Sequence, residues 1–76
     1  MKIEIYGSGC SKCRKTEEIV RQVVNELNIE AEISKIEDLQ KIIDKGIMMT
    51  PAVAIDGEIK ILGRVPSTQD VKKILQ

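Results

Sequence analysis

The chain has 76 residues, which is enough for one domain with a single small hydrophobic core. Twelve Lys and Arg residues balance twelve Asp and Glu residues, there is no histidine, and Tyr6 is the sole aromatic residue. This composition offers neither the basic surface nor the aromatic platform that nucleic acids require, and it lacks the positive charge that attracts a protein to an anionic membrane. We therefore expect one domain over residues 1–76 that binds neither.

The first residues indicate a cytoplasmic protein. Residues 1–5, MKIEI, alternate charged and apolar side chains and lack the apolar h-region of a signal peptide. No apolar run elsewhere in the sequence is long enough to span a bilayer. In the cytoplasm a lone pair of cysteines is more often catalytic or metal-binding than a structural disulfide.

Alternation and helical periodicity predict the first three elements. Lys2–Tyr6 alternates charged residues with isoleucine and ends at a glycine loop, as a strand would. Residues 11–27 carry an apolar stripe that repeats every three or four positions, which predicts an amphipathic helix with Asn28 as its stop. Residues 29–36 can extend again as a second strand.

A short helix is predicted next. The apolar positions of residues 39–43 have helical spacing, and Gly46 closes the segment. An earlier start is also open, because Ser34 and Glu37 have the spacing of a capping box. That start would begin the helix two or three residues sooner.

The last third predicts a hairpin and a final helix. Ala52–Ile55 and Glu58–Leu62 are β-rich runs on either side of Asp-Gly at residues 56–57, a strong signal for an antiparallel hairpin. Ser67, with Asp70 three residues later, then opens a helix whose apolar residues face inward. The predicted order is β-α-β-α-β-β-α.

Cys10 and Cys13, the two cysteines of the chain, stand three positions apart where the first helix begins. Unpaired N–H groups and the partial positive charge of a helix start stabilise a thiolate at Cys10, and Lys12 and Arg14 add to this effect. Cys13 falls on the apolar side of the helix, so we expect it to be buried and to stay protonated until Cys10 has reacted. Cys10 is thus the candidate for attack.

The predicted order, the motif Cys-Ser-Lys-Cys at residues 10–13 and the Thr50-Pro51 pair before the hairpin resemble the thioredoxin superfamily in its shortest form. In particular, the chain is similar to the small, glutaredoxin-sized redox-active disulfide proteins of archaea and bacteria, over essentially its whole length. The resemblance implies an α/β fold of three layers, a thioredoxin-like four-stranded mixed sheet with helices on both faces.

The resemblance also implies a function. Such a protein is a thiol-disulfide oxidoreductase that reduces or exchanges protein disulfides, with Cys10 as the nucleophile and Cys13 as the resolving cysteine. Its redox-active centre is the Cys10–Cys13 disulfide, with no other cofactor. In that superfamily the proline before the third strand is cis and lies beside the sulfurs, and the preceding backbone pairs with the substrate; the matching positions are Pro51 and Thr50.

The partners implied are disulfide-containing client proteins and a disulfide reductase, and we expect a monomer. Two charged residues are candidates for electrostatic or proton-transfer roles. Glu4 stands six residues before Cys10, where thioredoxins bury an acid, and could accept the proton of Cys13; the alternative is a strand residue on a partly solvated face. Lys12 is either an electrostatic aid to the cysteines or a solvated charge.

Met48 and Met49 precede the Thr50-Pro51 pair. They could form a soft apolar surface for partner peptides, but methionine commonly fills cores. We expect at least one of the two to be core filler.

Soft-metal binding is the alternative function. Small copper-chaperone domains also place a C-x-x-C loop after their first strand, and thiolates suit copper(I). A closed zinc site needs four ligands, which one chain with two thiols and no histidine cannot supply. Because copper-chaperone domains end on a strand and this chain is predicted to end on a helix, we expect a redox pair and no metal at Cys10 and Cys13.

Overall fold

The structure is a computed structural model that describes residues 1–9 and 11–76. The elements, in chain order, are β1 (Lys2–Tyr6), α1 (Ser11–Glu26), β2 (Glu32–Ile36), α2 (Leu39–Asp44), β3 (Ala52–Ile55), β4 (Glu58–Leu62) and α3 (Thr68–Leu75). The predicted order of strands and helices is confirmed.

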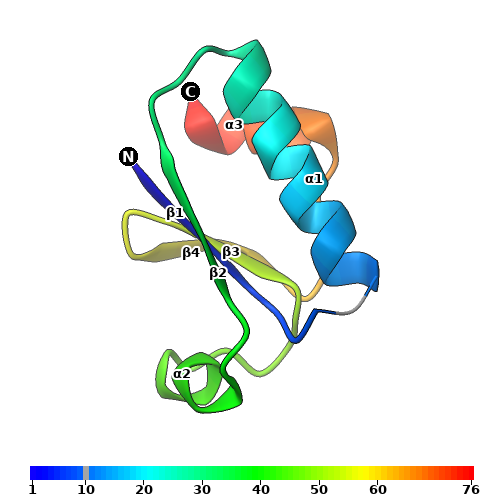
Figure 1. Ribbon diagram of the computed structural model, residues 1–76, viewed down its shortest axis with the longest axis vertical. Coiled ribbons are helices and arrows are strands. Elements are labelled where there is room, and N and C mark those ends of the chain that lie inside the picture. Colours follow the sequence, from blue (N-terminus) through cyan, green and yellow to red (C-terminus); the bar gives the residue numbers. More distant parts are fainter. Residues whose placement is uncertain (10) are drawn as a thin grey trace.

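The strands form one mixed sheet. In the part of the chain that the structure describes, four strands pair in the order β2-β1-β3-β4. β1 and β2 are parallel, whereas β1 with β3 and β3 with β4 are antiparallel. Figure 1 shows α1 and α3 together beside the sheet and α2 apart from them at its lower end. The three-layer α/β fold that the resemblance implies is confirmed.

The face of the sheet that carries α1 and α3 holds the larger core. Because side chains alternate along a strand, every second residue of β1 and β3 points to this face. The aliphatic residues buried there from strands and helices are Ile3, Ile5, Val20, Val23, Val53, Ile55, Ile61, Val71 and Leu75. Burial of this set against two helices is the main source of stability.

The opposite face is covered by α2 and the segment after it. Its buried residues come from β1, β3, α2 and residue 47, and they are Tyr6, Ile42, Ile47, Ala52 and Ala54. The residues that β3 contributes to this face are small alanines, and α2 is a helix of only six residues. The second core is therefore thinner than the first.

The second strand is shorter than predicted. It begins at Glu32 and not at residue 29, because Glu32 is the partner of Lys2, where β1 itself begins. Residues 29–31 have no strand beside them in that register. Before them, Asn28 adopts a left-handed conformation with φ of 53° and turns the chain out of α1, as its place in the sequence suggested.

Helix caps settle two boundaries. The Asp38 side chain accepts a hydrogen bond of 2.9 Å from the Gln40 N–H and caps α2, so the alternative start at Ser34 is wrong. Ser34 lies in β2, paired with Glu4. At α3, the prediction that Ser67 opens the helix is confirmed, and Ser67 and Asp70 together form a capping box.

The β3–β4 hairpin contains a bulge. Asp56 and Gly57 both have positive φ, 50° and 87°, as a tight two-residue turn requires. Further along, Val53 pairs with Ile61 whereas the next residue of β3 pairs with Ile59, so Lys60 is the extra residue. The two isoleucines, which alternation would put on one face, therefore pack on opposite faces of the sheet.

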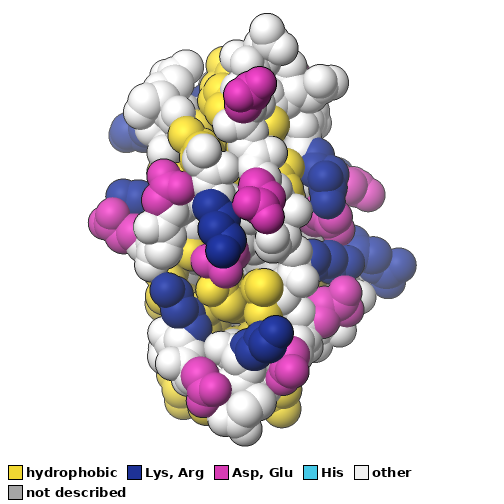
Figure 2. Space-filling view, turned by 60° about the vertical axis from the view of Figure 1, so that its left-hand side comes forward, with side chains coloured by type: hydrophobic (Ala, Val, Ile, Leu, Met, Phe, Trp, Pro, Cys, Tyr) yellow, Lys and Arg dark blue, Asp and Glu magenta, His cyan; other side chains and the backbone are white. Residues whose placement is uncertain are grey.

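Both chain termini lie in the upper half of the molecule, whereas α2 lies at the lower end (Figure 1). The surface seen in Figure 2 mixes charges of both signs, and hydrophobic side chains reach it again at the lower end, where Figure 1 shows α2. Among the described residues, none of the helices combines the length and the apolar character needed to cross a bilayer.

Candidate active site

Cys13 lies in the first turn of α1, with 1% of its surface exposed. Further along the same side of the helix, Val20 and Val23 pack on Ile3 and Ile5 of β1. This packing fixes the start of α1 over the end of β1. The prediction that Cys13 is buried on the apolar side of the helix is confirmed.

Gly7 is the residue against which the Cys13 side chain packs. It follows β1 directly and is buried, and its N–H donates a hydrogen bond of 3.0 Å to the Ile36 carbonyl. A Cβ atom added to Gly7 would overlap Cys13 Sγ and would lie 2.9 Å from Cys13 Cβ. The Cys13 side chain thus packs directly against the backbone at residue 7.

Cys10, the predicted nucleophile, lies outside the described residues. Its neighbours in the chain are described: Gly9 has φ of 84°, and Ser11 is the first residue of α1. The helix that begins at Ser11 has 16 residues. The N–H groups of the first turn of such a helix have no partner within the helix and favour a negative charge.

The Thr50–Pro51 peptide bond is cis, as the resemblance implies for this position. Pro51 is buried at the start of β3, and its carbonyl accepts a hydrogen bond of 2.9 Å from the Gly63 N–H at the end of β4. Thr50 is exposed. Thr50 thus lies next to an anchored proline, and it lines a groove.

This groove, about 230 Å³ in volume, brings the two predicted site segments together. Ser8, two residues before Cys10, and Thr50 both line it, and the rest of the lining is apolar. The apolar lining residues are Leu39, Ile42, Ile43, Ile47 and Met48. The groove thus connects the cysteine loop, α2 and the Thr50–Pro51 bond.

The expectation that Met48 or Met49 is core filler is wrong. Met48 is 88% exposed and Met49 is 57% exposed. The residue of this segment that enters the core is Ile47, at 2% exposure. The chain then passes the groove, and the next two side chains stay at the surface. Met48 lines the groove, and Met49 lies against Gly63.

Glu4 lies on the α2 face of the sheet, whereas Cys13 belongs to α1. It alternates with Ile3 and Ile5, which face α1, and it lines a pocket near Tyr6 and α2. Burial raises the pKa of the Tyr6 hydroxyl above its usual 10.0, and the nearby Glu4 carboxylate raises it further. Proton transfer from Cys13 to Glu4 would have to cross the sheet, so that role stays a prediction that the geometry does not favour.

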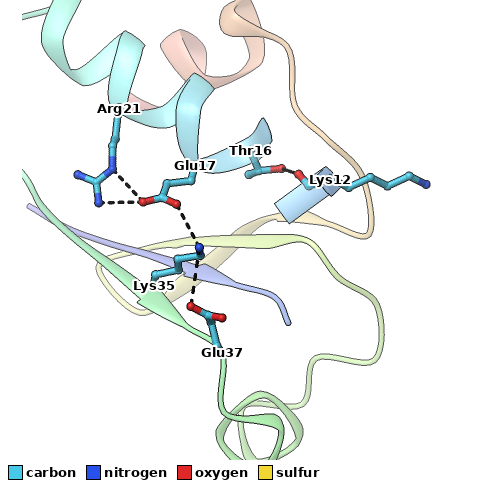
Figure 3. A network of polar contacts seen from close by, with 6 residues as sticks. All are labelled: Lys12, Thr16, Glu17, Arg21, Lys35 and Glu37. Carbon is cyan, nitrogen blue, oxygen red and sulfur yellow. Dashed lines mark hydrogen bonds and ion pairs between the residues drawn. The ribbon is translucent and has the colours of Figure 1, made fainter. Parts of the chain in front are cut away.

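Figure 3 shows a chain of ion pairs that joins α1 to β2. Arg21 donates to the Glu17 carboxylate at 3.0 Å, and Lys35 Nζ lies 3.4 Å from Glu17 and 3.7 Å from Glu37. The hydrogen bond from Arg21, together with Lys35, lowers the pKa of Glu17. The Lys12 side chain extends away from this network, and its predicted electrostatic role stays a prediction.

Two residues near the site had no role in the sequence-based interpretation. Gly7 was only part of a glycine loop, and Glu37 only a possible helix cap. The Glu37 carboxylate in fact approaches Gly9, where an added Cβ would lie 3.1 Å from Glu37 Oε2. Only the parallel pairing of β1 with β2 brings residues 9 and 37 together, and no local sequence pattern signals it.

Comparison with known proteins gives a consistent result over the whole chain. A family model described as a thioredoxin domain matches residues 1–76. A thioredoxin of Methanothermobacter thermautotrophicus is 48% identical over 75 residues, covering 99% of this chain and 97% of that protein. A thioredoxin of Methanocaldococcus jannaschii is 42% identical over 74 residues, covering 97% of this chain and 85% of that protein.

Fold, site and relatives agree. The strand and helix order is one of the features on which the resemblance was based, and the cis Thr50–Pro51 bond is a feature that the resemblance implied. The family match and the two archaeal thioredoxins extend that agreement to the sequence as a whole. The chain therefore belongs to the thioredoxin domain family and is a thiol-disulfide oxidoreductase.

Proposed function

We propose that this oxidoreductase reduces or exchanges disulfides of client proteins through Cys10 and Cys13. The burial of Cys13 is the observation that carries the proposal. A thiol that is 1% exposed, in the first turn of a helix, is out of reach of a folded client but only three positions from Cys10 in the chain. Such a thiol suits a second, intramolecular step.

The reaction begins with attack by the Cys10 thiolate on one sulfur of a client disulfide. A mixed disulfide forms as the client S–S bond breaks, and the departing client thiolate takes up a proton. The Cys13 thiol then loses its proton, and its sulfur attacks the Cys10 sulfur and releases the second client thiolate. The client gains two electrons, and Cys10 and Cys13 are left joined by a disulfide, which a disulfide reductase returns to the dithiol.

In this proposal the client binds along the exposed rim of the site, which is formed by Thr50 and the groove beside it. The Thr50 backbone is available for pairing because Thr50 is exposed beside the buried, hydrogen-bonded Pro51. The apolar groove next to it accepts an apolar side chain from the client, with the exposed Met48 as an adaptable wall. Binding at the rim brings the client disulfide to the start of α1.

A trapping experiment tests the division of labour between the cysteines. The Cys13→Ser variant should accumulate a mixed disulfide with a protein substrate, because the intermediate forms and cannot be resolved, while Cys10→Ser should trap little. Non-reducing electrophoresis and mass spectrometry measure the trapped species. Equal trapping by both variants, or trapping by Cys10→Ser alone, would contradict the assignment.

Elemental analysis separates this proposal from soft-metal binding. We expect the protein purified under reducing conditions to hold less than one tightly bound zinc or copper ion per chain, and its unfolding curve to be unchanged by a chelator. The physical reason is that the aliphatic core does not depend on a ligand cage. Stoichiometric metal that resists the chelator, with unfolding once it is removed, would favour the alternative.

A further inference from the structure

We propose that Gly7 is a positioning residue for the Cys13 sulfur, and that the lack of a side chain at residue 7 determines how readily the Cys10–Cys13 disulfide forms. The redox part of this inference rests on the proposed function. The packing part rests only on described residues. Gly7 touches no client in this scheme and acts through Cys13 alone.

The contact is steric. Gly7 and Cys13 are both buried, and the space that a Cβ at residue 7 would occupy is already filled by Cys13 Sγ, with Cys13 Cβ 2.9 Å away. Separations this short are not tolerated between carbon atoms in a packed interior. Any side chain at residue 7 therefore displaces the sulfur or shifts one of the two backbones.

Neither backbone can move away easily. The Gly7 N–H donates a hydrogen bond to the Ile36 carbonyl. This hydrogen bond continues the β1–β2 pairing by one residue beyond Tyr6. On the other side, α1 is anchored to the sheet by Val20 and Val23, both fully buried. The least costly response to a new Cβ is a rotation that displaces Cys13 Sγ, together with a small backbone shift that relieves the remaining contact with Cys13 Cβ.

The backbone conformation at residue 7 does not itself require glycine. Positive φ is found at Gly9, Gly46, Gly57 and Gly63, whereas Gly7 is outside that group. Alanine at residue 7 therefore does not have to adopt a left-handed backbone conformation, and it causes no strain of that origin. The effect of Gly7→Ala can be attributed to its contact with Cys13, which makes this substitution an unusually clean probe.

The consequence for the chemistry follows from disulfide geometry. A disulfide forms without strain only over a narrow range of separations and dihedral angles, and a strained one is more easily reduced. Displacing Cys13 Sγ should therefore shift the exchange equilibrium with glutathione toward the dithiol. We expect a shift of at least about tenfold for Gly7→Ala, which corresponds to a reduction potential roughly 30 mV higher.

The first measurement is this glutathione equilibrium for three proteins: the natural chain, Gly7→Ala and Gly57→Ala. Gly57 lies in the β3–β4 hairpin, where an added Cβ meets nothing within 4 Å, so its variant controls for the same substitution away from the cysteines. We expect the Gly57→Ala potential to equal that of the natural chain. If the Gly7→Ala potential also equals it, the proposal is wrong.

The second measurement is independent of redox chemistry. Under reducing conditions, Gly7→Ala should lower the equilibrium stability of the natural chain much more than that of Cys13→Ala, where Sγ is absent. We expect the change in the unfolding constant to differ at least tenfold between the two backgrounds, measured by denaturant titration. Equal losses in both backgrounds would mean that the two residues are not coupled.

This second measurement also covers the case in which Gly7→Ala does not fold. Recovery of a cooperative transition in the Gly7→Ala, Cys13→Gly double variant, which lacks both Cys13 atoms that the new Cβ would meet, would support the proposal. Failure of this double variant, while Cys13→Gly alone folds, would overturn it. Failure of the proposed function would look different. The trapping pattern of the two cysteine variants would then be wrong while the coupling between residues 7 and 13 persisted.

Discussion

The two faces of the sheet differ in how completely they are covered. On the α1 and α3 face, two helices bury a continuous aliphatic core, and Cys13 lies within this cover at 1% exposure. On the α2 face, a six-residue helix covers part of the sheet, and apolar side chains remain at the surface around the groove. The most exposed of these are Leu39, Ile43, Met48 and Met49, between 53% and 88% exposed.

This difference separates stability from recognition. A side chain on the covered face contributes mainly to folding, because removing it leaves a cavity. An apolar side chain on the open face contributes little to folding but is available to a client. The cysteine loop lies where the two faces meet, since Gly7 contacts Cys13 on one side and Ser8 lines the groove on the other.

The largest expected effect comes from the same substitution made on each face. Ile5→Ala, on the covered face at 1% exposure, should lower the free energy of unfolding by about 3 kcal/mol. Ile43→Ala, at 53% exposure, should lower it by less than about 0.5 kcal/mol. Urea titration of both variants measures this, and similar losses would break the comparison.

Reduction of a client disulfide should depend on the side chains of the open face, whereas stability depends on those of the covered face. Ile43→Gln or Met48→Gln should raise KM for a protein disulfide roughly fivefold, because each loses apolar contact in the groove, with kcat and the unfolding midpoint nearly unchanged. Lys73→Gln, an exposed change on α3, is the control and should leave KM unaltered. An unchanged KM for both groove variants would place client binding elsewhere.

The pH dependence of stability should differ between the two faces, although these effects are smaller than the ones above. One face carries a group with a lowered pKa and the other a group with a raised pKa. On the covered side, the hydrogen bond from Arg21 holds the pKa of Glu17 below its usual 4.5. A lowered pKa contributes stability that is present at neutral pH and is lost as the pH falls through the folded-state pKa. Arg21→Gln should therefore reduce the loss of stability below pH 4.5.

On the open face, Tyr6 should act at the alkaline end. Its pKa is raised by burial, and a raised pKa contributes stability that is fully present below 10.0 and is lost as the pH rises through the folded-state pKa. Tyr6→Phe removes the titrating hydroxyl and should flatten this alkaline decline. Denaturant titrations across pH 9–12 measure it, and an unchanged slope would assign the decline to other groups.

The parts of the fold that the sequence predicts well are those with a local cause. The Asp-Gly turn at residues 56–57 and the Ser67–Asp70 capping box are each specified by residues adjacent to them in the chain, and both are present. The burial of Cys13 follows from helical periodicity, which is also local. These signals suffice to order the elements and to locate the cysteine pair.

The parts that the sequence does not predict depend on contacts between distant segments. The bulge at Lys60 is set by the register of β4 on β3, and alternation alone gives the wrong face for one isoleucine. The exposure of Met48 and Met49 depends on Ile47 filling the space beneath α2. Gly7 contacts Cys13 because α1 folds back over β1, so the motif alone does not distinguish Gly7 from Gly9.

The position of the chain ends has a practical consequence. Both termini lie in the upper half of the molecule in Figure 1, and α2, which lines the groove, lies at the lower end of a body 32 Å long. A tag, a surface linker or a fused reporter attached at either terminus would project away from the groove. The protein could therefore be immobilised through either end with its groove directed toward the solution.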